Sequence, residues 1–356
     1  MEYSFSTREK NGGICLILSY KVNSKWKQKT RQGFKTLREA KQYQDKLLAA
    51  AKEDAACGAD PELADITFKS FTQNIYLRDK GSSLEYSTKR NYFFMLRSIP
   101  ALCDKPIREI TAGDVINVYQ DMARFSSGTR KNRFAQIRAI FNYALNPYKI
   151  ITANPADSVT QAKDKTIRRI KALTEKESRQ LLDALSDTPT FYMIAFIALN
   201  TGMRYGEIAG LTWSSINFPR QTITVDKQYN WISPQKRGFK AVKSRNGNRT
   251  IHMNTKLAAK LNEWKQTAPI SIDGRIIPTT PSTHPLMNRQ LRRLKQGISV
   301  HTLRHTFATM LLSKSKDINL VAAVLGDNVA TVAATYIHYT DDIRKEADQY
   351  IETIYK

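Results

Sequence analysis

The sequence predicts a multidomain, mainly α-helical protein that carries small β-sheets. Its 356 residues are enough for two or three domains with sizeable cores. Apolar side chains recur at helical spacing through residues 66–150, whereas β-rich runs are short and few. Two shifts in composition divide the chain, and we expect domains over residues 1–57, 66–153 and 173–356, with linkers over 58–65 and 154–172.

The chain is strongly basic, with a formal net charge of +24. Apolar residues make up 41%, which is enough for globular folding and unlike a disordered basic tail. A folded chain of this charge favours a polyanionic partner, and charge alone also fits a ribosomal or general RNA-binding protein. No apolar run approaches the length needed to cross a bilayer, which disfavours a membrane partner.

The N-terminus and the cysteines indicate the compartment. Residues 1–6 lack the basic-then-apolar pattern of an export signal, so we expect a cytoplasmic protein. Cys15, Cys57 and Cys103 are odd in number and far apart, which disfavours a disulfide framework and a cysteine-rich zinc site. We expect three ordinary, partly buried thiols and no metal.

The first 57 residues predict a small β-then-α module. Ile14–Tyr20 is a β-rich run, and Thr36–Glu39 matches a capping box that opens a helix. Between them, cations interleave with Trp26 and Phe34 and have no acidic partners nearby. We interpret this run as a DNA-contacting surface, with a solvated charged face as the plain alternative. The candidate residues are Lys25, Lys27, Lys29 and Arg31.

The middle of the chain predicts a helical bundle. Residues 53–65 are acidic and include Pro61, which is typical of a linker. Thr111 and Asp114 then match a helix start, and the last helix of the bundle carries an apolar stripe over residues 134–145. Cations beside that stripe indicate a basic, DNA-binding face of the bundle. They are Arg130, Lys131, Arg133 and Arg138.

A polar, mostly basic segment at residues 161–171 predicts an extended linker that can follow a phosphate backbone. Beyond it, Phe191–Leu199 is apolar on nearly all sides, which predicts a deeply buried helix. A helix that ends at Gly202 fits a glycine cap and projects Arg204 from a turn on a rigid base. The planar guanidinium suits a phosphate, and Glu207 can buttress it, although a surface ion pair is the plain alternative.

Lys243 lies between the β-rich runs 221–225 and 249–253, at the expected tip of a hairpin. A lysine in that position can enter a groove and act as a general acid if nearby cations lower its pKa. A solvated lysine is the plain alternative. Lys236, Arg237, Lys240 and Arg245 are nearby rivals.

His301 and Arg304 are three residues apart and share a helix face. His301 and His305 have the spacing of a metal pair, but no nearby carboxylate or cysteine completes a site. Tyr336 follows a turn at residues 324–328. A lone tyrosine usually packs or contacts nucleic acid, and this one becomes a candidate nucleophile only because the arginines, the lysine and the histidine precede it in order.

This set of residues resembles that of the tyrosine recombinases of the lambda-integrase family, which phages and integrative elements carry. The resemblance covers nearly the whole chain and implies an arm-site DNA-binding module, a helical core-binding domain and an α+β catalytic domain. The family's catalytic positions correspond to Arg204, Lys243, His301, Arg304 and Tyr336, with Glu207 as the acidic residue after the first arginine.

The resemblance implies that Tyr336 attacks a DNA phosphodiester and forms a 3′-phosphotyrosine, without ATP or a metal. It further implies double-stranded DNA with core and arm sites as substrate, a tetramer on DNA, and accessory DNA-bending and excision factors. Two other classes remain open. A type IB topoisomerase would use the same residues in a monomer, and a non-catalytic DNA-binding regulator would use only the helical units and the charge.

Asp327 departs from the family pattern, which has histidine or tryptophan nine residues before the nucleophile. That position normally donates a hydrogen bond to the phosphate, whereas an ionised aspartate cannot donate and repels an anion. Asn328 or His338 can supply the missing donor, and Arg304 or Lys314 can pair with the carboxylate. The last residues, 341–356, predict a helical tail that packs on a neighbouring subunit or on its own domain.

Overall fold

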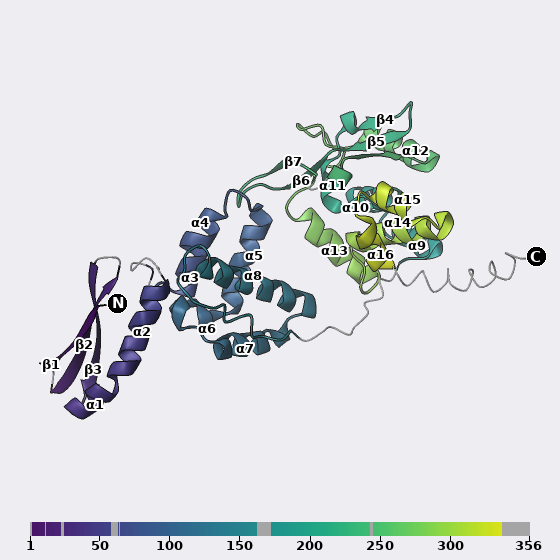
Figure 1. Ribbon diagram of the computed structural model, residues 1–356. Coiled ribbons are helices and arrows are strands. Elements are labelled where there is room, and N and C mark those ends of the chain that lie inside the picture. Colours follow the sequence, from purple (N-terminus) through teal and green to yellow (C-terminus); the bar gives the residue numbers. More distant parts are fainter. Residues whose placement is uncertain are drawn as a thin grey trace, which may run out of the picture. The chain divides into compact units, whose positions relative to one another are not determined.

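The computed structural model describes residues 2–10, 12–22, 25–57, 63, 65–161, 172–242 and 245–336 (Figure 1). The chain forms two compact units, residues 1–165 and residues 166–356. The predicted class, a multidomain and mainly α-helical protein with small sheets, is confirmed. The finer domain limits remain predictions.

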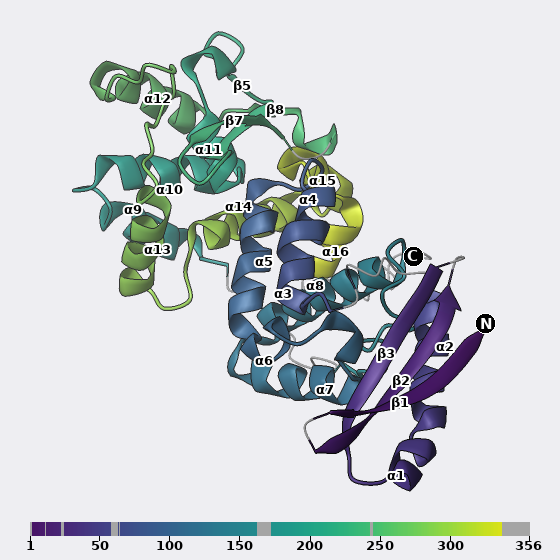
Figure 2. The same cartoon turned by 90° about the vertical axis from the view of Figure 1, so that its left-hand side faces the viewer.

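The first unit begins with a β-α module (Figure 2). Its antiparallel sheet has the order β1 (Tyr3–Lys10), β2 (Gly13–Val22), β3 (Lys25–Phe34). Alternate residues of β2 turn Leu16, Leu18 and Tyr20 inward, where they are buried with residues of the two helices that follow. Those helices are α1 (Leu37–Gln42) and α2 (Gln44–Cys57).

Two details of this module differ from expectation. Thr36 caps α1 by accepting from Glu39 N, but Glu39 reaches back to Lys35 N at 2.9 Å and not to Thr36 itself. Helix α2 also continues to Cys57, so the first five residues of the stretch expected to be a linker from residue 53 are helical. Alanines supply much of this segment, and their helix propensity outweighs its acidic, linker-like composition.

The rest of the first unit is a helical bundle. A run of α3 (Phe68–Phe71), the π-helical turn η2 (Thr72–Tyr76) and α4 (Leu77–Asp79) is followed by α5 (Tyr86–Ser98) and α6 (Pro100–Cys103). Then come α7 (Ala112–Asp121), which opens with the Thr111–Asp114 capping box, and α8 (Ser127–Leu145). Phe68, Phe71 and Phe141 are fully buried at the centre, so the periodic apolar stripes form one core.

The second unit places helices around a small sheet. Strands β4 (Ile216–Asn217), β5 (Thr222–Val225) and β8 (Arg249–His252) pair in that order. Helices α9 (Glu175–Asp183), α10 (Pro189–Thr201) and α11 (Tyr205–Gly210) precede the sheet. Helix α12 (Thr255–Thr267) and then α13 (Thr283–Leu294), α14 (Val300–Ser315), α15 (Ile318–Leu325) and α16 (Val329–Tyr336) follow it.

Helix α10 packs against α14 at the centre of this unit (Figure 1). Met193, Ile194 and Ile197 of α10 are buried against the same cluster as Val300 and Leu303 of α14. Within the described residues, no single helix is long and apolar enough to cross a membrane. The bent pair Ile318–Leu325 and Val329–Thr335 passes that test jointly, across an angle of 110°.

The sequence did not predict the hairpin of β6 (Lys227–Trp231) and β7 (Arg237–Ala241). In the sequence this hairpin lies between β5 and β8, and Lys243 comes after it, outside the described residues. The tip of the observed hairpin lies at residues 232–236. Every residue of β6 is half-buried, so the strand lacks the alternation of buried and exposed positions that identifies a strand.

Candidate active site

Gly202 ends α10 and sets the direction of Arg204. Its φ of 66° is left-handed, as the glycine cap predicted. A Cβ atom here would lie 2.5 Å from Phe307 and 2.6 Å from Leu325, so α14 and α15 close directly onto this turn. Arg204 follows as the extended N-cap residue of α11, with its side chain 41% exposed.

Glu207 is the buried anion of the site, with 4% of its side chain exposed. It accepts from Arg204 N at 3.0 Å and Nη1 at 2.7 Å, which confirms that it buttresses both the arginine and its backbone. It also accepts from Arg249 Nη2 at 2.9 Å. Burial alone raises the pKa of Glu207, but Arg249 and Arg204 outweigh it and hold the pKa below its ordinary value.

Arg249 is a member of this cluster that sequence reasoning did not identify as a site residue. It begins β8 and is 6% exposed. Besides Glu207, it donates through Nε to the Val324 carbonyl oxygen at 2.8 Å and through Nη1 to the Gly247 oxygen at 3.0 Å. Arg249 therefore ties the sheet to the end of α15. In the sequence it was visible only as the first residue of the β-rich run 249–253.

Arg304 comes from α14 and is 3% exposed. Its Nη1 donates to the Gly202 carbonyl oxygen at 2.7 Å, and its Nη2 donates to the Leu325 oxygen at 3.1 Å. Arg304 thus joins the glycine turn before Arg204 to the end of α15. The guanidinium is held by backbone acceptors on two sides, so its position is set before any ligand arrives.

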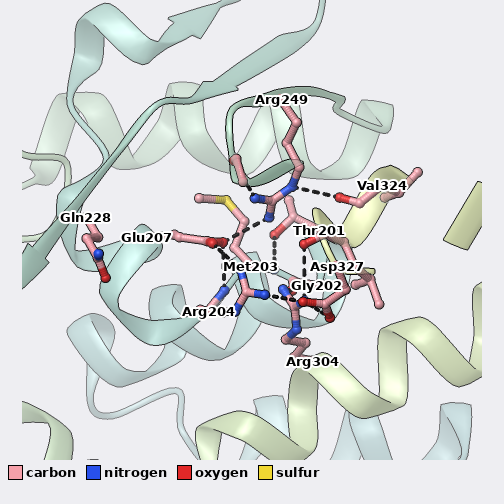
Figure 3. Close-up of polar contacts among 12 residues, drawn as sticks. Thr201, Gly202, Met203, Arg204, Glu207, Gln228, Arg249, Arg304, Val324 and Asp327 are labelled. Atoms are coloured by element: carbon pink, nitrogen blue, oxygen red, sulfur yellow. Dashed lines mark hydrogen bonds and ion pairs between the residues drawn. The ribbon is translucent and has the colours of Figure 1, made fainter. Parts of the chain in front are cut away.

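Asp327 follows Gly326, the left-handed cap of α15, and bridges the two arginines. Arg204 Nη2 donates to Oδ1 and Arg304 Nη2 donates to Oδ2 (Figure 3). The expected pairing with Arg304 is therefore present, and Arg204 adds a second partner. Asn328, a candidate donor to a phosphate, turns its Oδ1 to the backbone N of Ala330 at 2.8 Å and caps α16.

His301 lies one turn before Arg304 on α14. Partial burial, then the charges of Arg304 and Arg204, lower the pKa of His301, against the opposing effect of Asp327. Its ring contacts that of His305 edge-on, with the two ring centres 4.3 Å apart. Burial, together with His301 and Arg304, lowers the pKa of His305 to about 4. Both imidazoles are therefore neutral near pH 7. Within the described residues, no group of three or more His, Cys, Asp or Glu side chains is placed to hold a metal ion.

Two protein families match this chain. Residues 171–342 match the phage integrase family, and residues 7–51 match an arm DNA-binding domain. The ICEBs1 integrase of Bacillus subtilis (strain 168) is 24% identical, over 89% of this chain and 90% of the relative. A tyrosine recombinase of Pseudothermotoga lettingae is 25% identical, over 63% of this chain and 75% of the relative. The chain belongs to the lambda-integrase family of tyrosine recombinases.

Solved structures of recombinases share this fold. The integrase of transposon Tn1549 in complex with transposon right end DNA aligns with a TM-score of 0.68 and 22% identity, over 82% of this chain and all of that one. A lambda integrase dimer bound to a COC′ core site aligns with a TM-score of 0.59 and 18% identity, over 92% and 93%. As a tyrosine recombinase, the chain is an enzyme that breaks and rejoins DNA.

Two of the predicted catalytic residues of this recombinase lie partly or wholly outside the described part of the chain. Tyr336 is the last residue of α16, and its side chain lies outside the described part. Lys243 itself lies outside the described residues, as do His338 and the expected tail over 341–356. Of the rivals to the lysine, Arg237 donates to the Thr279 oxygen at 3.2 Å.

The predicted DNA-contacting cations of the N-terminal module lie on the helix-covered side of the sheet. Lys27 pairs across the strands with Tyr20, Lys29 with Leu18, and Arg31 with Leu16, and these partners are buried. Paired residues share a face, because side chains alternate along each strand. Phe34 packs into the module's core on that same side, so it is not part of an exposed surface. Trp26 is 58% exposed, on the opposite face. The side chain of Lys25 lies outside the described part.

The basic residues of α8 stack on aromatic rings. The Arg133 guanidinium lies 3.8 Å from the centre of the Phe125 ring, and that of Arg130 lies 4.9 Å from Tyr119. Lys131 is exposed on the same helix. Arg138 pairs with Asp157 at 2.8 Å, so one of the four predicted cations has an acidic partner. The cysteines Cys15 and Cys103 are fully buried, more than expected, while the side chain of Cys57 is not described.

Proposed function

We propose that this recombinase integrates and excises a mobile DNA element by cutting and rejoining double-stranded DNA at specific sites. Three facts support the proposal. The family model covers the second unit, relatives are named integrases, and one structural relative was solved on transposon DNA. The net charge of +24 suits a polyanionic substrate.

The single observation that carries the chemistry is the convergence of Arg204 and Arg304 on one carboxylate, Asp327. Two guanidinium groups that hold the two oxygens of one anion present the donors that a phosphodiester needs for its two non-bridging oxygens. Such preorganised charge stabilises the additional negative charge that builds on the phosphorus centre during displacement. Glu207 accepts a hydrogen bond from Arg204, and Arg249 in turn donates to Glu207, so both residues support this arrangement.

In the proposed step, the Tyr336 oxygen attacks the phosphorus atom, a new O–P bond forms, and the bond to the 5′ oxygen breaks. His301, held neutral by its environment, accepts the tyrosine proton. Lys243 protonates the departing 5′ oxygen. The 3′-phosphotyrosine is itself a phosphodiester in which the tyrosyl ester replaces the broken 5′ ester, so a 5′-hydroxyl of a second strand can reverse the step on a new partner.

Exchange between two duplexes requires four such cleavages, and we therefore propose a tetramer on DNA. Residues 1–57 would bind arm sites, and residues 66–153 would bind the core site. Accessory DNA-bending and excision factors are further proposed partners. The arm DNA-binding match at residues 7–51 supports the first assignment.

A nicked suicide duplex that carries the core site tests the proposal, because loss of a short 5′ fragment traps the covalent adduct. Wild type is expected to form an adduct that maps to Tyr336. Tyr336→Phe is expected to lose the adduct and keep DNA binding, because only the attacking oxygen is removed. Tyr339→Phe is the matched control and is expected to retain the adduct. If the adduct were lost only in Tyr339→Phe, the nucleophile would be Tyr339, and the assignment to Tyr336 would be wrong.

A further inference from the structure

Asp327 occupies the position between two guanidinium groups that the proposed reaction needs for the substrate phosphate. Each of its oxygens accepts from a different arginine, and 20% of its side chain is exposed. A carboxylate and a phosphodiester are both anions with two acceptor oxygens, and they compete for the same donors. The paired arginines therefore already hold an anion in this structure.

A cavity of about 490 Å³ adjoins the carboxylate. Asp327 lies in its wall together with Asn246, Asn248 and Asn319, and Ala323 lines the side formed by α15. The asparagine amides are neutral donors, and Arg249, which also lines the cavity, adds a guanidinium that attracts a carboxylate. The cavity thus provides both the space and the hydrogen-bond donors for the carboxylate once it has left the arginines.

We propose that Asp327 is an internal competitor that the scissile phosphate must displace, and that it then moves into this asparagine-lined cavity. The inference rests on the proposed function, since it concerns the same arginines. In the absence of DNA, the negative charge of the carboxylate offsets the repulsion between the two guanidinium groups. It also competes with free anions for their donors. On DNA, the phosphate takes over both donors, and Asp327 no longer repels it.

Asp327→Asn tests the competition directly. The amide is neutral and has a donor NH₂ group in place of one oxygen, so it cannot offer each guanidinium group an oxygen of its own. The DNA-free variant is expected to bind inorganic phosphate about 10-fold more tightly than wild type by calorimetric titration, the scale of one charge-assisted hydrogen bond. Its single-turnover cleavage of the nicked duplex is expected to equal or exceed the wild-type rate. Unchanged phosphate affinity, or slower cleavage with DNA binding intact, would overturn the proposal.

Ala323→Leu tests the exit route. Ala323 is an exposed residue of α15, so the larger side chain fills the cavity and leaves the core of the unit unchanged. Cleavage by this variant is expected to slow, because the carboxylate loses its second position. The double variant Ala323→Leu/Asp327→Asn is expected to recover the rate of Asp327→Asn alone, since nothing then needs to move. Ala184→Leu, at an exposed position at the end of α9, is the matched control.

The outcomes separate the two proposals. If no variant and no wild-type protein forms an adduct, the proposed function fails, while the phosphate titration still tests the competition. A slow double variant would show that Ala323→Leu acts by some other route and would overturn the movement of Asp327. Thermal unfolding of each variant confirms that a loss of rate is not a loss of folded protein.

Discussion

Arg304 donates to the Gly202 carbonyl oxygen across 2.7 Å and so joins two segments that lie 102 residues apart in the chain. The bond connects α14 to the turn that ends α10 and precedes Arg204. The two arginines therefore belong to one rigid construction, although they differ in burial. Arg304 is 3% exposed and Arg204 is 41% exposed.

This difference predicts distinct effects of Arg304→Ala and Arg204→Ala. Both variants are expected to slow cleavage by about 10²-fold or more, the scale for loss of one preorganised donor. Only Arg304→Ala is expected to lower the free energy of unfolding strongly, by about 3–5 kcal/mol, because it leaves buried carbonyl oxygens and a carboxylate without their donor. Denaturant unfolding and single-turnover cleavage measure the two effects. Equal stability losses would contradict this division.

Lysine at either position is expected to restore little activity, because an ammonium lacks the planar fork that contacts two acceptors at once. Arg179→Lys is the matched control, since Arg179 is 77% exposed and makes only a surface pair with Glu175 on α9. Full cleavage by Arg204→Lys would argue against a two-point contact with phosphate.

Glu207 is predicted to make the second unit sensitive to acid. Its folded-state pKa lies below the ordinary value of about 4.3, so its ionisation stabilises the fold above that value. This stability is lost as pH falls through the lowered folded-state pKa. Glu207→Ala is expected to cost about 3–5 kcal/mol at pH 7 because it leaves buried arginine charge unpaired. Glu263→Ala, on the exposed face of α12, is expected to cost about 1 kcal/mol or less. Similar losses in both variants would contradict the role of burial.

His301 is predicted to determine the acid side of the rate profile. Its pKa lies below the ordinary 6.5, so the neutral base persists below that pH and is lost as pH falls further. The charges that face it are Arg304, Arg204 and Asp327, with His305 on its own helix. Cleavage rates measured from pH 5 to 8 are expected to fall only below about 6.5 in wild type.

His301→Gln is expected to be slow and to lose that pH dependence. His305→Gln is expected to keep it, because His305 titrates near pH 4. A rate that already falls above pH 6.5, or an unchanged profile in His301→Gln, would show that another group supplies the base.

Removal of residues 1–57 is predicted to separate two kinds of DNA binding. The β-α module has its own buried core around Leu16 and Leu18, so its loss leaves the cores of the bundle and the second unit intact. The truncated protein is expected to lose affinity for arm sites and to retain cleavage of the core-site suicide duplex. Loss of all core cleavage in a folded truncation would contradict the separation.

Local features of the site could be predicted from sequence, whereas contacts between distant segments could not. The glycine cap at Gly202 and the support of Arg204 by Glu207 depend on neighbours four or fewer residues apart. Arg249 and its partner Glu207 are 42 residues apart, and Asp327 and its partner Arg204 are 123 residues apart. No periodic pattern encodes such pairings. Asp327 was therefore expected to repel an anion, although the fold neutralises it.

In the fold, helices with clear apolar stripes were predictable, and the β6–β7 hairpin was not, because every residue of β6 is half-buried and that strand shows no alternation. Phe34 shows the converse difficulty. Its neighbours in sequence are basic, but a register shift in the pairing of β2 with β3 turns it to the core, where it packs with Tyr43. The two aromatic residues of this basic run therefore differ in the structure, because Trp26 is exposed on one face of the sheet and Phe34 is packed in the core on the other.

Among the described residues of the reaction centre, the pairing of three guanidinium groups with Glu207 and Asp327 leaves a single excess positive charge on these five side chains. One phosphodiester neutralises it, so few counterions are released when that phosphate enters. The dependence of DNA affinity on ionic strength must then arise elsewhere, from the many cations outside the centre that give the chain its net +24. High salt is therefore expected to weaken capture of the DNA far more than it slows the cutting of DNA already bound.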